Sequence, residues 1–210
     1  MEQQRERLIN APWPAMVLVL ILLVCFVLQS LVGVDAVAAR LGFAPRALAF
    51  GVWQPLFISL FLHGGWAHLM ANSAFALAFG TPVSRRMGED AAGAVVFFLF
   101  FLVCGVLANL GFAAMDPHDV APLVGASGAI GGLMGATSRL MVPGERLAAF
   151  NSPQVVGMAL SWLAVNLLIA FIPWAAPGAG HAIVAWQAHL AGYAAGLLLI
   201  APTLRLLGQP

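Results

Sequence analysis

Long stretches of apolar residues with almost no charge constrain this chain more than any other feature. Hydrophobic residues make up 62% of its 210 residues and charged residues only 8%, whereas about a quarter of the residues in a soluble domain are charged. A helix needs about 20 apolar residues to cross a bilayer core of about 30 Å. Six stretches approach that length, at residues 14–33, 64–84, 91–114, 127–142, 155–172 and 182–204. We therefore expect an all-α, polytopic membrane protein with six transmembrane helices.

The first apolar stretch also has an alternative interpretation, as a cleaved signal peptide. Two arginines precede it, and the small-residue sequence Ala36-Val37-Ala38 follows it. Its apolar core, residues 14–33, is longer than that of a typical cleaved signal, which favours a retained membrane span. We expect a short cytoplasmic N-terminus over residues 1–13 and a single membrane domain over residues 14–210.

The positions of the basic residues predict the orientation of the spans. All nine are arginine, and if all six stretches cross the membrane, seven fall on one side and only Arg40 and Arg46 on the other. Basic residues gather on the cytoplasmic side of membrane proteins, so both termini are expected in the cytoplasm. Arg40 and Arg46 lie in the loop 34–62, which is apolar enough that part of it is expected in the membrane interface.

The remaining composition argues against several other classes of protein. The net charge is +1, and the arginines form no basic patch of the kind that binds nucleic acid. Both cysteines, Cys25 and Cys104, lie in apolar stretches. They are expected to be buried hydrophobic residues and to form neither a disulfide nor a metal site.

Polar side chains inside the apolar stretches are costly in hydrocarbon and therefore indicate a functional site. Ser127 begins the fourth stretch, His189 lies near the start of the sixth, and His68 and Asn72 lie in the second. At 1.5 Å per residue from the inner end of each span, Ser127 and His189 both lie ~22 Å up, and His68 and Asn72 lie ~26 and ~20 Å up. In a core of about 30 Å all four fall in one layer below the outer face. Three spans are thus predicted to form one site.

A serine and a histidine in that layer favour nucleophilic catalysis. A serine hydroxyl needs a neighbouring base to take its proton, and neutral histidine is the usual base. Because no Asp or Glu lies inside a span, we expect a dyad of Ser127 and His189. The oxyanion of the tetrahedral intermediate needs hydrogen-bond donors. His68 and Asn72, one helical turn apart, and the backbone N–H of Ser127 are candidates.

Residues around this site are expected to shape it. Gly128 follows the serine, and Gly192 and Gly196 follow the histidine along its own stretch; small residues at this spacing let helices approach closely. His63, just ahead of the second stretch, is expected to tie down the loop above the site. Glycines at such positions also pack helices in membrane proteins that have no active site.

The polar residues also have structural interpretations. A lone membrane serine usually bonds the backbone of its own helix, and a lone membrane histidine is more often structural or part of an ion path. His63 and His68 alone would indicate a metal site almost as strongly as an enzyme. The matched depth of the whole set favours catalysis over each of these interpretations.

Three motifs, in this order on alternate spans, resemble the rhomboid family of intramembrane serine proteases. They are His63-x4-His68-x3-Asn72, Gly125-x-Ser127-Gly128 and Ala188-His189-x2-Gly192-x3-Gly196. The resemblance extends over nearly the whole chain beyond the first dozen residues. It implies the basic six-helix bacterial form of the family, without an added soluble domain.

The resemblance also implies a function. The dyad would act without a metal or another cofactor, and the site would open to the outer side of a bacterial cytoplasmic membrane. Substrates would be membrane proteins with one span, cut near its outer end after a small residue beside helix-destabilising sequence. Apart from the resemblance, entry of a substrate would need a movable gate, and the fifth stretch is the candidate. Trp162, Phe171 and Trp174, which follows the stretch, are candidates to line it; the alternative is that these large aromatic residues face lipid or the interface.

Two positions depart from the family pattern. The first outer loop often contains Trp-Arg, whereas this chain has Trp53-Gln54, so the anchoring of the loop is expected to differ. Some members carry a tyrosine four residues after the serine, stacked on the catalytic histidine. This chain has Gly131 there, so His189 must be oriented in another way. Neither departure removes a catalytic group.

Two other functions stay open. A non-catalytic rhomboid-like protein would bind membrane clients without cutting them, but such a protein is expected to lack Ser127 or His189, and both are present. A transporter or channel would need a polar path across both leaflets, whereas the polar set occupies only the outer half. The zinc motif His-Glu-x-x-His and an intramembrane Asp pair, which other intramembrane proteases use, are absent from the sequence.

Overall fold

The computed structural model describes residues 10–144, 146–171 and 185–209, and every regular element in these ranges is helical. The one β-type contact among them is an isolated bridge between Phe43 and Leu123. The elements are α1 (Trp13–Val32), α2 (Val34–Leu41), η1 (Pro45–Phe50), α3 (Pro55–Ile58), η2 (Ser59–Phe61), α4 (Trp66–Met87), α5 (Ala91–Met115), α6 (Ser127–Leu140), α7 (Pro153–Phe171) and α8 (Trp186–Leu206). The prediction of an all-α fold is confirmed for these residues.

Each of the six apolar stretches corresponds to one helix, α1, α4, α5, α6, α7 or α8, although residues 182–184 of the sixth stretch lie outside the described ranges. In the described part of the chain, α1, α5, α7 and α8 are long and apolar enough to cross a membrane, so this is a multi-pass membrane protein. α4 has 22 residues and is long enough to cross a membrane, but it is less apolar because it includes His68 and Asn72 of the polar set. α6 has 14 residues and is about 21 Å long at 1.5 Å per residue, shorter than a bilayer core.

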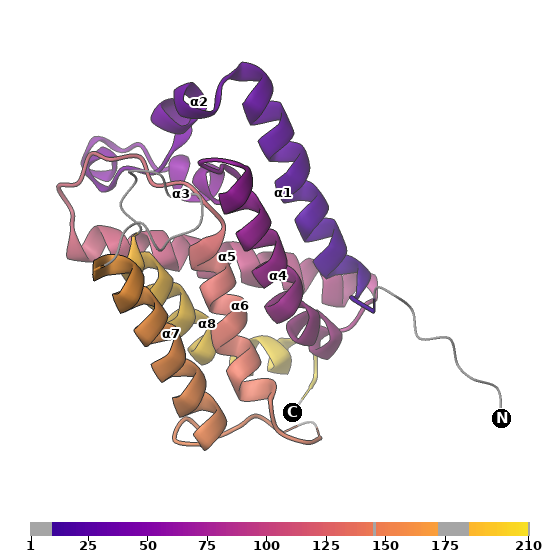
Figure 1. Ribbon diagram of the computed structural model, residues 1–210. Coiled ribbons are helices and arrows are strands. Elements are labelled where there is room, and N and C mark those ends of the chain that lie inside the picture. Colours follow the sequence, from indigo (N-terminus) through magenta and orange to yellow (C-terminus); the bar gives the residue numbers. More distant parts are fainter. Residues whose placement is uncertain (1–9, 145, 172–184, 210) are drawn as a thin grey trace.

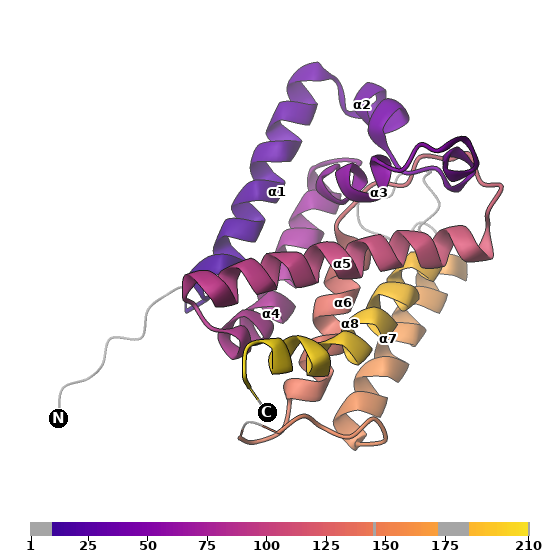
Figure 2. The same ribbon diagram turned by 180° about the vertical axis from the view of Figure 1, so that it is seen from behind.

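The short helix α6 occupies the centre of the bundle. It packs against α4, α5, α7 and α8, and α5 crosses behind it at a steep angle (Figures 1 and 2). Residues 128–138 of α6 are all buried. Glycine adds no side chain to the helix surface, so the glycine-rich sequence of α6 allows neighbours to approach it from several sides at once.

The contact between α6 and α8 is a contact between backbones. A Cβ added at Gly192 would overlap the carbonyl oxygen of Gly128, and a Cβ added at Gly196 would overlap that of Gly132. α5 packs equally closely, because a Cβ at Gly128 would lie 2.6 Å from the Cβ of Ala108. Side chains larger than hydrogen do not fit at these positions without moving a helix.

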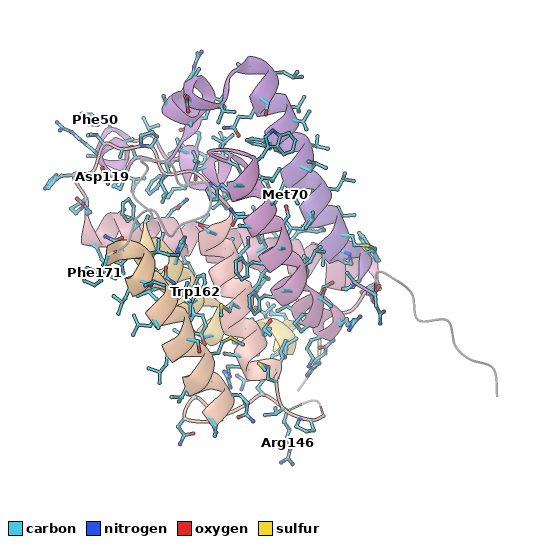
Figure 3. The ribbon with its side chains drawn as sticks, in the orientation of Figure 1. Phe50, Met70, Asp119, Arg146, Trp162 and Phe171 are labelled. Carbon is cyan, nitrogen blue, oxygen red and sulfur yellow. The ribbon has the colours of Figure 1, made fainter. Side chains whose placement is uncertain are left out.

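α7 packs much more loosely. Of its described residues only Val155 and Asn166 are buried, and it lies on the outside of the bundle, where Figure 3 shows Trp162 and Phe171 on it. Most of its large apolar side chains are exposed, as lipid contact requires. They are Val156, Leu160, Leu163, Val165, Leu167, Leu168 and Phe171.

The two described terminal segments meet the same end of the bundle. The guanidinium of Arg85 donates to the carbonyl of Asn10, and that of Arg86 donates to the side chain of Gln209. Arg146 lies at this end too, opposite Asp119 (Figure 3). Three of the arginines expected on one side, Arg85, Arg86 and Arg146, therefore lie at one end of the described part of the molecule.

The loop 34–62 folds over the other end of the bundle as α2, η1, α3 and η2 (Figure 1). It pairs with the segment ahead of α6: the N–H of Phe43 donates to the carbonyl of Leu123 (2.9 Å), and the N–H of Leu123 donates back (2.8 Å). The N–H of Arg46 donates to the carbonyl of Asp119 (3.1 Å). This loop therefore supports the segment that leads to Ser127.

Candidate active site

The structure brings Ser127 and His189 together. Ser127 is the first residue of α6 and His189 lies in the first turn of α8. The distance from Ser127 Oγ to His189 Nε2 is 2.8 Å, and both residues are half-buried. This is the distance of a hydrogen bond from a serine hydroxyl to the ring nitrogen of a base.

The turn ahead of Ser127 is fixed by residues that the sequence analysis did not select. The N–H of Gly125 donates to the carbonyl of Ser59 (2.9 Å). Asn109, buried in α5, donates from Nδ2 to Ser59 Oγ (3.1 Å) and to the carbonyl of Leu56 (3.0 Å). A buried amide with good partners holds a loop firmly. Asn109 thus supports the position of Ser127 through the first loop.

His68 lies directly beside the serine turn. Gly125 has φ +128°, and a Cβ there would lie 2.9 Å from Cε1 and Nε2 of the His68 ring and 3.7 Å from Ser127 Oγ. Only glycine suits both this backbone conformation and this close approach. The N–H of Gly64 donates to His68 Nδ1 (3.4 Å), which leaves His68 Nε2 as the ring's N–H donor on the side of Gly125.

Asn72 is buried one turn further along α4. Its Nδ2 donates to the carbonyl of His68, 3.1 Å away. This bond within the helix uses one of the two amide hydrogens, and the other is left to donate elsewhere. The structure thus places Asn72 next to His68, as the sequence spacing predicts.

His63 lies behind His68 and is fully buried. The rings of His63 and His68 meet edge to face with centroids 5.3 Å apart. The side chain of Gln29, from α1, accepts from the N–H of His63 and donates to its carbonyl, both at 2.9 Å. The loop above the site is therefore held by the backbone of His63 and by Gln29, which the sequence analysis did not select. No group of three or more potential metal-ligating side chains occurs among the described residues.

Two residues of α7 hold His189 from the side away from Ser127. Asn166 Oδ1 lies 2.7 Å from His189 Nδ1. The Trp162 ring lies 5.7 Å from the His189 ring, tilted by 38°, and Trp162 Nε1 donates to the His189 carbonyl (3.3 Å). Asn166 was missed by the sequence analysis. Its signal was an amide inside an apolar stretch, where polar side chains usually have a function.

The aromatic residues proposed to line a gate have different surroundings. Trp162 lies against His189, as described above, and Phe171 is 82% exposed at the end of the helix. Trp174 falls outside the described residues. Trp162 is therefore part of the surroundings of the site, whereas Phe171 faces away from the bundle.

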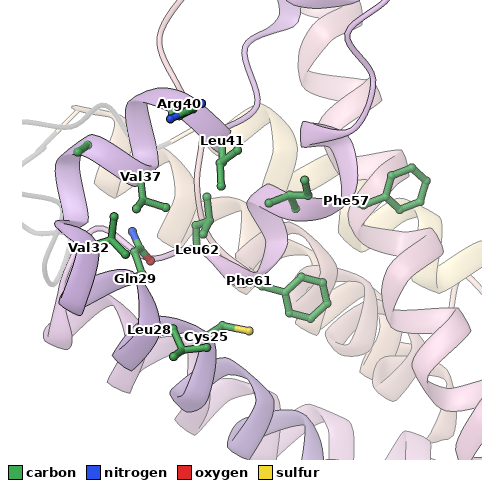
Figure 4. A pocket seen from close by; sticks show the side chains of 12 residues that line it. Cys25, Leu28, Gln29, Val32, Val37, Arg40, Leu41, Phe57, Phe61 and Leu62 are labelled. Atoms are coloured by element: carbon green, nitrogen blue, oxygen red, sulfur yellow. The ribbon is translucent and has the colours of Figure 1, made fainter.

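An apolar pocket of about 860 Å³ lies apart from these residues (Figure 4). It is an open pocket lined by α1, α2 and residues 57–62, with Arg40 and Gln29 as its polar side chains. None of the residues predicted for the site lines it. The serine and the histidine instead lie where α6 and α8 begin, next to the loops.

Comparison with known proteins gives the same assignment as the motifs. Residues 49–206 match the model of the Rhomboid domain. YdcA of Bacillus subtilis, named as a candidate rhomboid protease, is 29% identical over 152 residues, which cover 72% of this chain and 68% of that protein. RHOMBOID-like protein 5 of Arabidopsis thaliana is 27% identical over 70% of this chain and 42% of its own length. Rhomboid protease GluP of Bacillus subtilis is 35% identical over 42% of this chain and 16% of its own length. The resemblance seen in the three motifs is confirmed: the chain belongs to the rhomboid family.

Proposed function

We propose that this chain is an intramembrane serine endopeptidase in which Ser127 is the nucleophile and His189 the general base. The observation that carries the proposal is the 2.8 Å distance between Ser127 Oγ and His189 Nε2, joining two residues 62 positions apart. A serine that only satisfied its own helix would bond a backbone carbonyl one turn back. Ser127 instead faces the imidazole ring of His189 on α8.

The reaction begins when Ser127 Oγ attacks a substrate carbonyl and its proton passes to His189 Nε2. The tetrahedral intermediate collapses to an acyl-enzyme as His189 returns the proton to the leaving amine. Water, activated by the same ring, then adds to the acyl group and frees the serine. Each step uses one nucleophile and one base, which is the pair that the geometry supplies.

The oxyanion would be bound by donors on two helices. The N–H of Ser127 belongs to the first turn of α6, where backbone N–H groups have no partner within the helix. His68 Nε2 faces the turn at Gly125, and Asn72 keeps a free amide hydrogen. Removing one such donor typically lowers the rate about 10²–10³-fold.

The site would lie below the outer surface of a bacterial cytoplasmic membrane. In this arrangement α1, α4, α5, α7, α8 and the short α6 all cross the membrane and form the membrane domain of residues 14–210, and both termini lie in the cytoplasm. The arginines at the end where Asn10 and Gln209 lie support that orientation. Because α6 is shorter than the bilayer core, its start leaves room above Ser127 for water.

The substrates proposed are membrane proteins with one span, cut near its outer end. A peptide bond inside a helix is shielded by the helix, so the segment must unwind before Ser127 can reach a carbonyl. Helix-destabilising residues lower the cost of that unwinding, and a small residue at the cut fits the glycine-lined start of α6. The name of GluP as a rhomboid protease supports this reaction class.

Covalent labelling by a fluorophosphonate probe tests the proposal without knowledge of a substrate. Wild-type protein in lipid should be labelled, and Ser127→Ala and His189→Ala should abolish labelling. Ser138→Ala is the matched control, because Ser138 lies on α6 but bonds its own helix at Gly135 (2.6 Å); it should be labelled like wild type. Labelling that survives Ser127→Ala, or folded wild-type protein that does not react, would contradict the proposal. The second result would favour a client-binding rhomboid relative.

A further inference from the structure

Asn166 of α7 bonds the ring of His189 at the nitrogen that faces away from Ser127. Asn166 Oδ1 lies 2.7 Å from His189 Nδ1, and Ser127 Oγ lies 2.8 Å from His189 Nε2. The three side chains form one line of hydrogen bonds across three helices. We infer that Asn166 is a positioning residue, which fixes the tautomer and the orientation of His189 for proton transfer from Ser127. The inference rests on the proposed protease function.

The second contact of Asn166 determines which end of its amide faces the ring. Asn166 Nδ2 donates to the carbonyl of Trp162, one turn back on α7, at 2.8 Å. The amide oxygen is then the atom turned to His189, and an amide oxygen only accepts hydrogen bonds. His189 Nδ1 must therefore carry the proton. That leaves the lone pair on Nε2, the nitrogen within reach of Ser127, as a general base requires.

The fold provides no side chain from α6 for this purpose. The position four residues after the serine is Gly131, and a Cβ there would lie 2.8 Å from the His189 carbonyl. The space beside His189 on α6 is thus filled by the backbone of α8. The ring is supported from α7 instead, by the hydrogen bond to Asn166 and by the tilted ring of Trp162.

The burial of Asn166 indicates that both ends of its amide need a hydrogen-bond partner. Asn166 is 1% exposed on a helix whose other described side chains, apart from Val155, are not buried. A buried amide without partners costs several kcal/mol, so such a residue is tolerated where both of its ends are paired. Here one end is paired within α7 and the other with the ring of the proposed base.

In the reaction Asn166 stays neutral. Its Oδ1 accepts the Nδ1 hydrogen of His189 before and after the ring takes the proton of Ser127, so no second proton moves. The contribution of Asn166 is to keep one tautomer and one ring orientation. In serine proteases, loss of the group that fixes the tautomer of the histidine lowers kcat by about 10⁴-fold when the wrong tautomer results.

The test compares the rate of Ser127 phosphonylation in full-length variants reconstituted in lipid. Asn166→Leu removes the acceptor at nearly constant size, Asn166→Asp keeps an acceptor oxygen, and Gln154→Leu makes the amide-to-leucine change at an exposed position of α7. We expect Asn166→Leu to lower the limiting inactivation rate constant about tenfold to a hundredfold with unchanged probe affinity. Asn166→Asp should react faster than Asn166→Leu, because its carboxylate still accepts from His189 Nδ1, and Gln154→Leu should stay within about threefold of wild type.

Two results would overturn the inference while leaving the protease function intact. Asn166→Leu could react at the wild-type rate, or Asn166→Asp could be as slow as Asn166→Leu with the same loss of thermal stability, which would show a packing role only. A wild-type protein that does not react would contradict the protease function itself.

A ¹⁵N NMR spectrum of histidine-labelled protein reads the tautomer without any reaction. Wild-type His189 should carry its proton on Nδ1, and Asn166→Leu should mix the two tautomers. A wild-type His189 with its proton on Nε2 would overturn the inference whether or not Ser127 reacts.

Discussion

α6 and α8 pack tightly against each other, whereas α7 packs loosely against the rest of the bundle. α6 and α8 meet backbone to backbone at Gly128 and Gly192, and nearly every residue of α6 is buried. α7 buries only Val155 and Asn166 among its described residues. The helices that carry the serine and the histidine are therefore closely fixed to each other, whereas the helix that contacts the far side of the histidine is held by few side chains.

The difference separates two requirements of a serine–histidine pair. Ser127 and His189 lie on helices whose backbones already touch at Gly128 and Gly192, so we expect the distance between the two side chains to vary little when a side chain elsewhere changes. The orientation of the His189 ring depends on two side chains of a loosely packed helix, Asn166 and Trp162. Changes in α6 and α8 should thus affect stability and reactivity together, and changes in α7 should affect reactivity with little effect on stability.

Among substitutions that keep Ser127 and His189, the largest effect is expected from Gly192→Ala. The new methyl group would overlap the carbonyl oxygen of Gly128, so α6 and α8 must move apart. Overpacking of this kind typically costs about 1–3 kcal/mol, and a displacement of about 1 Å between reacting groups can cost about 10²-fold in rate. Thermal unfolding and probe labelling of the reconstituted protein should both show the loss.

Gly157→Ala on α7 is the control for that substitution. A Cβ at Gly157 would meet no atom within 4 Å, and alanine favours a helix over glycine by about 0.5–1 kcal/mol. The variant should unfold at the same or a slightly higher temperature and react like wild type. Equal damage from Gly157→Ala and Gly192→Ala would remove the distinction between the two regions.

An intermediate effect is expected from Gln29→Leu, which tests the support of the outer loop. The substitution leaves the buried N–H and carbonyl of His63 without the two 2.9 Å hydrogen bonds from Gln29. An unpaired buried polar group costs about 1–3 kcal/mol, so the unfolding temperature should fall. Ser30→Ala, the next residue on α1, removes a bond within its own helix to Phe26 and should change stability much less. Equal unfolding temperatures for both variants would contradict the role of Gln29.

The smallest effect is expected from Trp162→Phe. The substitution keeps an aromatic ring beside His189 and removes only the Nε1 hydrogen bond to the His189 carbonyl, which is 3.3 Å long. If the lost hydrogen bond stabilises the reactive orientation of the His189 ring by about 1 kcal/mol, the labelling rate should be about fivefold lower. The unfolding temperature should change little. A fall as large as that of Gly192→Ala would show that α7 sets the distance between serine and histidine as well as the ring orientation.

The sequence was informative where a residue's role depends on its own helix. Ser127 was expected at the start of a span and begins α6, and the glycines after it lie in the predicted close contacts. Pro45 and Pro55 begin η1 and α3, a signal for the start of a helix that the description of the first loop as partly interfacial did not use. These features follow from local chain chemistry.

Contacts between distant segments could not be read in the same way. Asn166 meets His189 only because α7 is rotated so that its one buried amide faces α8, and apolar residues on all sides of α7 leave no periodic pattern that reveals this rotation. Gln29 likewise meets the backbone of His63, 34 residues away. A backbone partner has no side-chain signature, so no motif in the sequence marks it.

The most direct test of the Ser127–His189 pair is to locate the probe adduct in the wild-type chain. Protein in lipid nanodiscs would be treated with a fluorophosphonate, digested and sequenced by tandem mass spectrometry. We predict one adduct per chain, on Ser127, formed only while His189 is present. An adduct on another serine, or quantitative recovery of unmodified Ser127 from folded protein, would contradict the claim that the 2.8 Å contact between Ser127 and His189 is a catalytic pair.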